Sequence, residues 1–375
     1  MINDLENKKI LIVGKGIEGT AAYKYLRKHL PDAVIDILDQ KDGDNYLDKQ
    51  KKYDIAIKSP GVKPELIKIP YTTSTNIFLG NAKGKAIGVT GTKGKSTTST
   101  LIYKMLKEGG KDAYLGGNIG QAPLDFLDKL NDQSWTVLEM SSFQLRDLKI
   151  SPYIAVFLMI GEEHLDYHKT FATYIDAKRN ILRFQTPTDF AIINRDYLTS
   201  HESDIHTKGK MFQVSRERKC ENGCFVEDNA VWISIDGKKE KIIDVDRIKL
   251  IGRHNLENVC AAVVAATLAG ASKDSIRKVL SEFSGLEHRL EFVKDINGIR
   301  FYNDSLATIP QATMEALQAL PETETLIAGG HDRGLDYSHL AQYLINGQVK
   351  TLILFPPTGE RIWEEICKAR HRMVP

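Results

Sequence analysis

The segment Lys85-Ala-Ile-Gly-Val-Thr-Gly-Thr-Lys-Gly-Lys-Ser96 predicts a strand, a glycine-rich loop and the start of a helix in direct succession. The helix is predicted over residues 97–107 and stops at Gly109-Gly110. Backbone N–H groups of such a loop surround phosphate groups, and the positive end of the helix attracts their charge. Lys95 is placed to reach the β and γ oxygens, and the Ser96 hydroxyl to ligate Mg²⁺. A nucleotide cradle in an α/β protein is therefore predicted, against the alternative of a flexible linker.

The loop departs from the common phosphate-binding pattern G-x-x-x-x-G-K-[ST], which requires glycine at position 89. The chain has Val89 there, and Gly88 comes one residue early. The segment from Val89 to Ser96 instead resembles the ATP loop of the Mur ligase superfamily, which includes the peptidoglycan-precursor ligases and folylpolyglutamate synthase. The resemblance implies that one continuous run of residues binds ATP: Gly91, Thr92, Lys93, Gly94, Lys95, Ser96 and Thr97.

Length and composition restrict the class of protein. At 375 residues the chain is long enough for about two and a half domains. Its 51 Lys and Arg residues nearly balance 49 Asp and Glu residues, which fits neither a surface that coats nucleic acid nor a disordered chain. The apolar stretches are far shorter than the roughly 20 residues of a membrane helix, and residues 1–15 lack a signal peptide's cleavage site. A cytoplasmic monomer is expected.

The cysteines are few and scattered, which does not indicate a secreted disulfide framework. Cys220 and Cys224 flank Glu-Asn-Gly, a string that is either a hairpin turn or half of a zinc site. No second Cys/His pair follows at a suitable spacing, so a hairpin is the favoured prediction.

The first 60 residues contain another strand–glycine–helix pattern. Residues 8–13 form the strand and residues 20–29 the helix, with Gly14-Lys-Gly16-Ile17-Glu18-Gly19 between them. Glycines at this turn let a diphosphate approach the helix N-terminus. Alone, the pattern also fits a plain tight turn or an NAD site, whereas the family resemblance implies a uridine-nucleotide substrate. The residues predicted for this site are Gly14, Gly16, Ile17, Glu18, Asp39, Ser59 and Gly61, the last three from the ends of two further strands at 34–38 and 54–57.

Two strings downstream narrow the resemblance. Gly116-Gly-Asn-Ile-Gly120 and Glu139-Met-Ser-Ser-Phe-Gln-Leu145 are similar to the superfamily branch that adds D-glutamate. Glu139 follows a strand at 135–138 and faces the phosphate loop, where a Mg²⁺ ligand is needed. The resemblance implies that the muramoyl substrate is contacted by Asn118, Ser141 and Gln144. The alternative is that the serine and glutamine only cap the turn after the strand.

A strand at 153–159 leads into Gly161-Glu-Glu-His-Leu-Asp-Tyr-His168, which is similar to the family's metal segment. The resemblance implies that His164 binds a second Mg²⁺, although spacing alone would make it a surface histidine, since Mg²⁺ prefers oxygen ligands. Two departures stand out: Glu163 replaces the usual aspartate and Met159 a common asparagine.

The helix at 171–184 contains Lys178, which the family pattern implies is carbamylated by CO₂. An ammonium about 4 Å from a cation would be repelled by several kcal/mol, whereas a carbamate is an anion that can ligate or orient a cation. The alternative is an ordinary solvated lysine.

Residues 200–250 mix turn residues with short alternating strands, which predicts a β-rich insertion. After it, Ile251-Gly-Arg-His-Asn-Leu-Glu-Asn258 resembles a segment whose asparagines, here Asn255 and Asn258, contact ATP. Asn255 also suits a helix N-cap. Further on, the resemblance implies that Arg289 reaches the γ-phosphate and that Asp304 belongs to the ATP site.

The last part of the chain departs from the family. Leu306 stands where many members carry a lysine aimed at the carboxylate of the incoming amino acid. Thr308 and Arg333 are predicted for this site, with Arg333 supplying the missing charge by a bidentate grip. A strand at 349–355 and a helix at 360–370 give three βα units, where the family has a fuller Rossmann-like sheet. The amino-acid site therefore looks half built, as if the chain were truncated or completed by a partner.

Together these inferences predict three α/β domains: a Rossmann-like uridine-nucleotide domain at 1–82, a P-loop-type ATPase domain at 83–286 and a shortened Rossmann-like domain at 287–375. The resemblance implies an ADP-forming ligase of peptidoglycan-precursor synthesis, which joins D-glutamate to UDP-N-acetylmuramoyl-L-alanine through an acyl phosphate. Such a ligase uses ATP and two Mg²⁺ ions, which the resemblance implies are held by Ser96, Glu139, His164 and Lys178. Lys95 and Arg289 are expected to assist catalysis. The alternatives are a sister ligase, a weakly catalytic nucleotide-binding homologue and, least favoured, an NAD-dependent oxidoreductase.

Overall fold

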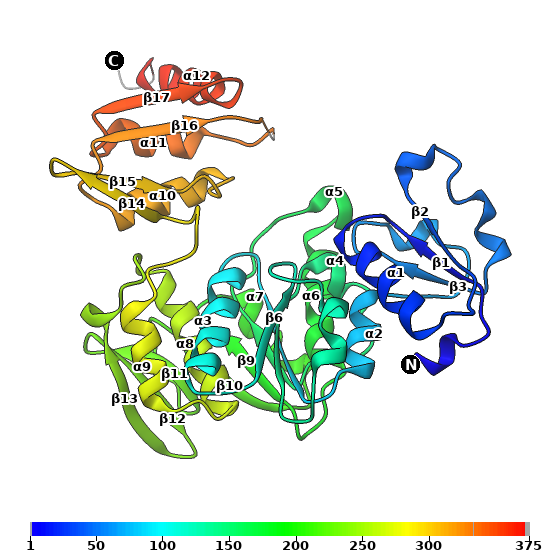
Figure 1. Ribbon diagram of the computed structural model, residues 1–375. Coiled ribbons are helices and arrows are strands. Elements are labelled where there is room, and N and C mark those ends of the chain that lie inside the picture. The colour runs from blue at the N-terminus through cyan, green and yellow to red at the C-terminus, as the bar shows by residue number, and fades with distance from the viewer. Residues whose placement is uncertain (1, 333, 372–375) are drawn as a thin grey trace. The chain divides into compact units, whose positions relative to one another are not determined.

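The computed structural model describes residues 2–332 and 334–371, and the contacts within it form two compact units (Figure 1). The first unit extends to Ile248 and also includes Leu256–Ser281. The second comprises Lys249–Asn255 and the chain from Glu282 onward. In the part of the chain that is described, no helix combines the length and the apolar character that crossing a membrane requires.

The N-terminal part of the first unit is a parallel four-stranded sheet of order β2-β1-β3-β4. The inner strand β1 is wholly buried, as expected for an apolar run that is covered on both faces. The predicted strand–glycine–helix pattern is found, and the close packing explains a glycine: a Cβ on Gly19 would lie 1.9 Å from the Gly14 carbonyl oxygen. The elements are β1 (Ile10–Val13), α1 (Ile17–His29), β2 (Ile35–Leu38), β3 (Ile55–Lys58), β4 (Tyr71–Thr72) and α2 (Ser74–Asn81).

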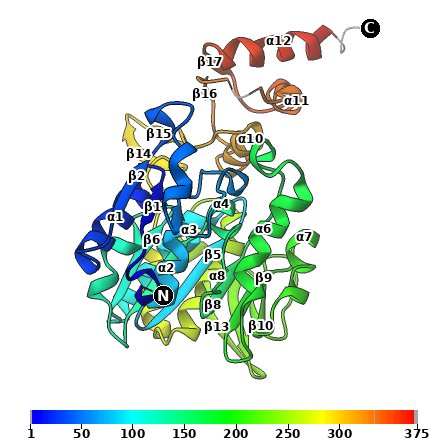
Figure 2. The same ribbon diagram turned by 90° about the vertical axis from the view of Figure 1, so that its right-hand side faces the viewer.

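The rest of the first unit is built on a nine-stranded sheet of order β13-β12-β11-β10-β9-β8-β5-β7-β6. Figure 2 shows β10, β9, β8 and β5 next to one another. The strands are β5 (Lys85–Thr90), β6 (Ala113–Gly117), β7 (Trp135–Glu139), β8 (Ile154–Phe157), β9 (Phe190–Asn194), β10 (Lys210–Ser215), β11 (Gly223–Glu227), β12 (Ala230–Ile235) and β13 (Lys238–Asp244). The β-rich segment predicted at 200–250 thus continues the central sheet, and its last three strands are antiparallel.

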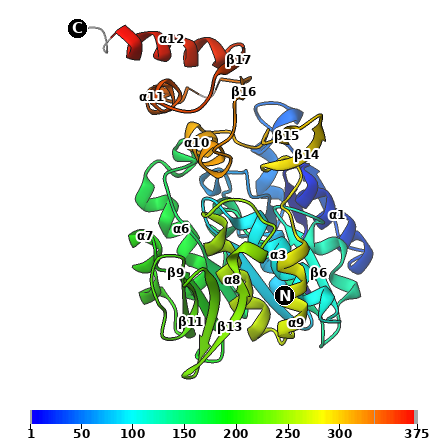
Figure 3. The same cartoon turned by 90° about the vertical axis from the view of Figure 1, so that its left-hand side faces the viewer.

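Helices cover this sheet and position the predicted site. Helix α3 packs on β5, β6 and β7, and α6 packs on β5. Helices α8 and α9 lie beside the β10–β13 half of the sheet (Figures 1 and 3), where Arg277 of α9 donates to the Ile242 carbonyl oxygen of β13 at 2.7 Å. The helices are α3 (Lys95–Glu108), α4 (Ser142–Leu145), α5 (Leu165–His168), α6 (Phe171–Arg183), α7 (Leu198–His201), α8 (Asn255–Leu268) and α9 (Lys273–Glu282).

The hairpin predicted between Cys220 and Cys224 is wrong. The loop joins β10 to β11, and these strands pair in parallel, with Val214 opposite Cys224. The Asn-Gly signal has another cause: Gly223 has φ +145°, and a Cβ there would lie 1.8 Å from the Gln213 carbonyl oxygen. The glycine therefore permits a close approach of strands. Both cysteines are free and buried, and within the described residues no group of three or more His, Cys, Asp or Glu side chains is arranged to hold a metal ion.

The second unit contains two small sheets. Strands β14 (Glu291–Ile296) and β15 (Ile299–Asn303) form an antiparallel pair, and β16 (Thr325–Gly329) and β17 (Thr351–Phe355) a parallel one. The helices between and after them follow the predicted alternation: α10 (Pro310–Ala319), α11 (Ser338–Asn346) and α12 (Thr358–His371). Its core is a cluster of buried side chains that come mainly from the helices: Leu317, Tyr337, Leu340, Ala341, Leu344, Ile362 and Ile366.

Candidate functional site

The glycine-rich loop between β5 and α3 has the geometry of a phosphate cradle. Gly94 adopts φ +83° immediately before α3, and a Cβ on it would lie 2.1 Å from the Asn258 side-chain oxygen. The Lys95 ammonium donates to the carbonyl oxygens of Gly91 and Thr92, each at 2.9 Å, and thereby closes the loop on itself. Ser96 and Thr97 lie in the first turn of α3, which begins two residues earlier than predicted. The loop therefore presents the N-terminal end of a 14-residue helix to a ligand.

The loop is tied to the segment after β8. The Thr92 backbone N–H donates to the Met159 carbonyl oxygen at 2.7 Å. The Thr92 hydroxyl donates to the Gly161 carbonyl oxygen at 2.9 Å and lies 2.9 Å from the Tyr174 hydroxyl. At the edge of this network, the Lys93 ammonium lies 3.6 Å from the Glu163 carboxylate. The predicted phosphate loop and the predicted metal segment are thus in direct contact.

Lys178 reaches the same loop from α6. Its side chain is 1% exposed, and its Nζ donates to the Gly91 carbonyl oxygen at 2.9 Å. The Tyr174 ring centroid lies 4.8 Å from Nζ. Burial, and secondarily the charge of Lys95, hold the pKa of Lys178 well below its ordinary value. The prediction of an ordinary solvated lysine, which was the alternative, is wrong, and the amine is biased toward its neutral form.

Glu139 ends β7 directly beside the phosphate-loop strand, where it pairs with Val89. The residue is 1% exposed. Its Oε1 accepts a hydrogen bond from the Asn118 side-chain amide at 2.9 Å, whereas Oε2 is buried and has no hydrogen-bond partner. A buried carboxylate oxygen without a partner is costly unless a cation or donor is supplied. These residues therefore fit a hard cation that a bound nucleotide would bring.

His164 is a less complete fit. It has φ +56° and precedes α5, and its ring packs on Phe143 with centroids 4.9 Å apart. The pKa of His164 lies below its ordinary value, because partial burial lowers it more than the neighbouring Glu163 carboxylate raises it. A neutral imidazole is able to bind a metal ion. Across the described residues, however, no three His, Cys, Asp or Glu side chains form a ready cluster that could hold a metal ion.

Two of the predicted muramoyl contacts, Ser141 and Gln144, lie at the start of α4. Ser141 and Gln144 form a capping box at the start of α4, so the alternative role in capping is found. The Gln144 side-chain amide also donates to the Glu18 carboxylate at 2.6 Å. Burial raises the pKa of Glu18, although the hydrogen bond from Gln144 opposes it. Two predicted substrate residues that are far apart in the sequence are thereby brought together.

The glycine turn after β1 gathers the other predicted uridine-site residues. The Ser59 hydroxyl donates to the Gly14 carbonyl oxygen at 3.3 Å. Asp39 accepts from the Lys15 backbone N–H at 2.7 Å, a hydrogen bond that lowers the pKa of Asp39. Gly16, Ile17 and Gly61 are exposed around this turn.

The remaining predicted residues belong to the second unit, apart from Asn258. Asn255 begins α8, and its side chain donates back to the Ile251 carbonyl oxygen at 2.7 Å. Asp304 accepts from the Leu290 backbone N–H at 2.9 Å, and burial raises the pKa of Asp304 while Arg289 opposes the rise. Arg289 and Thr308 are exposed. Arg333 lies outside the described residues.

Several side chains of this region carried no sequence signal of their own. Lys58 and Asp147 form a buried ion pair with Nζ and Oδ2 3.0 Å apart, and Tyr167 donates to the Pro60 carbonyl oxygen at 3.2 Å. On α8, Glu257 is buried beside Asn258, and burial raises the pKa of Glu257 to about 7. None of these contacts could be predicted from a local sequence pattern, because the residues that form each ion pair or hydrogen bond are far apart in the sequence.

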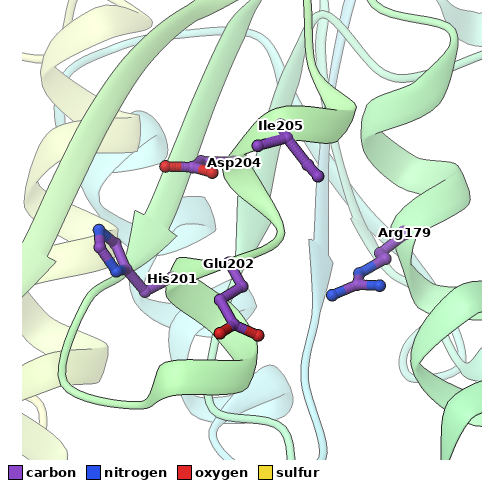
Figure 4. Close-up of a pocket in the computed structure, with 5 residues that line it drawn as sticks. All are labelled: Arg179, His201, Glu202, Asp204 and Ile205. Atoms are coloured by element: carbon purple, nitrogen blue, oxygen red, sulfur yellow. The ribbon is translucent and has the colours of Figure 1, made fainter.

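A separate hollow of about 410 Å³ lies near α6 and α7 (Figure 4). Its lining consists of Arg179, His201, Glu202, Asp204 and Ile205. The guanidinium of Arg179 is engaged in a hydrogen bond from Nε to the Ser203 hydroxyl at 3.0 Å. None of the predicted site residues lines this hollow.

Comparisons with known proteins agree on one family. Residues 89–266 match the family model described as Mur ligase middle domain. The chain is 39% identical over 396 residues to a UDP-N-acetylmuramoylalanine–D-glutamate ligase of Geobacillus kaustophilus, covering 97% of this chain and 86% of that protein. It is 35% identical over 386 residues to the ligase of the same name from Thermoanaerobacter pseudethanolicus, covering 96% and 85%.

Solved structures share the fold at low sequence identity. UDP-N-acetylmuramate-alanine ligase MurC from Thermotoga maritima matches with a TM-score of 0.60 and 19% identity, over 97% of this chain and 89% of that one. MurF from Acinetobacter baumannii matches with a TM-score of 0.62 and 18% identity, over 83% and 74%.

Proposed function

The chain belongs to the Mur ligase family, and we propose that it is an ATP-dependent ligase that joins D-glutamate to UDP-N-acetylmuramoyl-L-alanine. The observation that carries the proposal is local. A phosphate loop, closed by Lys95, lies beside Glu139, a buried carboxylate with an unpartnered oxygen. This combination suits transfer of a phosphoryl group better than hydride transfer, because it supplies fixed donors and a cation site.

The chain's own groups would act mainly by positioning. The N–H groups of the phosphate loop hold the triphosphate, and Lys95 exchanges the Gly91 and Thr92 carbonyl oxygens for phosphate oxygens. The substrate carboxylate attacks the γ-phosphorus, ADP leaves, and an acyl phosphate forms. The amine of D-glutamate then attacks the acyl carbon, and inorganic phosphate leaves. Exclusion of water protects the acyl phosphate from hydrolysis.

Magnesium would be held at Glu139 Oε2 and the Ser96 hydroxyl, with a second ion near His164 and the carbamate of Lys178. When bound, Mg²⁺ offsets the charge of the phosphate oxygens. Glu139 is kept in place for this role by the hydrogen bond from Asn118.

The substrate sites are assigned by domain. We propose the domain division 1–82, 83–286 and 287–375, with the uridine nucleotide at Gly14, Asp39 and Ser59. The muramoyl part extends toward Asn118, Ser141 and Gln144, which lie at the ends of strands and turns of the central sheet. In the last domain, Arg289 and Asp304 are proposed for ATP, and Thr308 and Arg333 for D-glutamate.

The test is ADP formation that depends on all three substrates. Purified protein with ATP and Mg²⁺ is assayed with UDP-N-acetylmuramoyl-L-alanine and with D-glutamate, each omitted in turn. Lys95→Ala and Glu139→Gln are expected to lower kcat by roughly 10²–10³-fold. Exposed Lys107→Ala, at the other end of α3, is the control. Turnover with L-glutamate or another amino acid instead would indicate a sister ligase, and ATP binding without phosphate release would contradict the proposal.

A further inference from the structure

The buried ion pair between Lys58 and Asp147 joins the two sheets of the first unit. Lys58 is the last residue of β3, and Asp147 follows α4 in the central part of the chain. Their side chains are 0% and 7% exposed, and Nζ lies 3.0 Å from Oδ2. The Lys58 ammonium also donates to the carbonyl oxygens of Ser59 at 3.1 Å and Val62 at 2.9 Å. All three ammonium donors are therefore used.

Such a pair contributes little to stability by itself. Taking an ammonium and a carboxylate out of water costs several kcal/mol per ion, and apolar replacements of buried pairs are often neutral or stabilising. The pair does fix the conformation of the neighbouring backbone, because a buried ammonium whose hydrogen bonds are all made allows only one arrangement of the groups that accept them.

Asp147 also accepts hydrogen bonds from two residues of the N-terminal part of the first unit. Its Oδ1 accepts from the Tyr71 hydroxyl at 2.8 Å, and its carbonyl oxygen accepts from the Asn76 side-chain amide at 2.8 Å. The Asn76 side-chain oxygen in turn accepts from the Lys149 backbone N–H at 2.8 Å. The turn after α4 is thereby bound to β4 and α2.

The loop 59–62, which accepts hydrogen bonds from Lys58, also accepts hydrogen bonds from the predicted metal segment. The Tyr167 hydroxyl donates to the Pro60 carbonyl oxygen at 3.2 Å and to that of Val62 at 3.4 Å. Tyr167 lies on α5, next to His164, and both rings pack on Phe143, with centroids 4.4 Å and 4.9 Å away. The loop 59–62 is therefore linked to α4 through Lys58 and to α5 through Tyr167.

We propose that the Lys58–Asp147 pair is a positioning device that sets the loop 59–62, and with it the uridine-nucleotide substrate, in register with the phosphate loop. Lys58 has no exposed surface, so it does not touch the substrate but acts through the loop. The inference rests on the proposed function, because it concerns the substrate of that reaction. It goes further by naming two residues that determine how well that substrate is presented.

The test uses the full chain with both charges removed. Lys58→Met alone would leave a buried carboxylate unpaired and is expected to fold poorly. The variant Lys58→Met/Asp147→Asn removes both charges of the pair and keeps an acceptor for Tyr71. We expect its melting temperature to stay near that of the wild type, while KM for UDP-N-acetylmuramoyl-L-alanine rises about tenfold or more and KM for ATP stays within about threefold. The dissociation constant for the UDP precursor, from isothermal titration, should rise with KM.

Tyr53→Phe is the matched control, because it removes a 2.7 Å hydrogen bond to Asp36 in the same sheet, away from the loop. It should leave both KM values unchanged. Wild-type KM and precursor affinity in the double variant would overturn the inference. So would a parallel rise of both KM values with a loss of melting temperature, which indicates a purely structural role. If the wild type releases no phosphate, the proposed function fails, and the precursor titration alone decides the inference.

Discussion

Lys178 and Glu139 show how burial prepares single side chains for chemistry. Each is 1% exposed beside the phosphate loop, where an unpaired polar atom is costly. Lys178 has only a carbonyl oxygen and a hydroxyl as acceptors, and one Glu139 oxygen has no donor. These surroundings support the proposal that Lys178 takes up a carbamate and that Glu139 holds a cation.

Lys178 is predicted to carry a carbamate when CO₂ is present. Only a neutral amine adds to CO₂, releasing a proton, and burial biases Lys178 toward that form. With ¹³C-bicarbonate, NMR should show a carbamate carbon in the wild type that is missing in Lys178→Met. The variant should lose roughly 10²-fold in kcat. Lys107→Met, an exposed change, should keep both the signal and the activity. A missing signal in the wild type at saturating bicarbonate would refute the prediction.

Glu257 predicts a particular pH dependence of stability. Burial raises its pKa to about 7, against an opposing effect of Arg216. The folded chain thus binds this proton more tightly than the unfolded chain does. The stabilisation is fully present below the ordinary carboxyl pKa and is lost as the pH rises through about 7.

Glu257→Gln removes this titration while keeping the size of the side chain. Between pH 5 and pH 8 the free energy of unfolding of the wild type should fall by roughly 1–3 kcal/mol more than that of the variant. Urea denaturation at pH 5, 6, 7 and 8 measures the difference. Exposed Glu221→Gln should follow the wild type, and parallel curves for Glu257→Gln and wild type would contradict the assignment.

The phosphate loop depends on one glycine, Gly94, for two reasons. Gly94 has φ +83°, and the Asn258 side chain fills the space where a Cβ would be. Gly94→Ala is therefore expected to destabilise the protein by about 1–3 kcal/mol and to raise KM for ATP about tenfold or more. Gly237→Ala, with φ +76° but open space, shares only the backbone cost. Equal effects of both variants on KM for ATP would show that the contact with Asn258 is unimportant.

The elements that the sequence predicts well are those with a complete local signal. Residues 85–108 combine an apolar run, a glycine loop and a helical period, and the structure has the predicted strand, loop and helix there. The turn at Cys220–Cys224 was predicted wrongly, because Asn-Gly reports a local backbone need and not the direction of the next strand. The Lys58–Asp147 pair was not predictable, since neither residue belongs to a pattern and only the packing of two sheets brings them together.

The proposed chemistry uses residues of both compact units. The phosphate loop, Glu139 and Lys178 belong to the first, and Arg289 and Asp304 to the second. If Arg289 donates to the γ-phosphate as proposed, turnover should depend on it more strongly than ATP binding does, because the phosphate loop supplies most of the donors to the triphosphate. Binding and turnover are therefore expected to respond differently to a change in the second unit.

Arg289→Ala tests this separation. We expect kcat to fall roughly 10²–10³-fold, because a donor to the transferring phosphoryl group is lost, while the dissociation constant for ATP changes less than about fivefold. Arg300→Ala is the control, since Arg300 is an exposed arginine of the same unit that pairs with Glu322. It should leave kcat unchanged. ATP affinity from isothermal titration and kcat from ADP release are measured on the same preparations. If Arg289→Ala weakens ATP binding as much as it slows turnover, the arginine acts on the ground state. If it does neither, Arg289 takes no part in phosphoryl transfer.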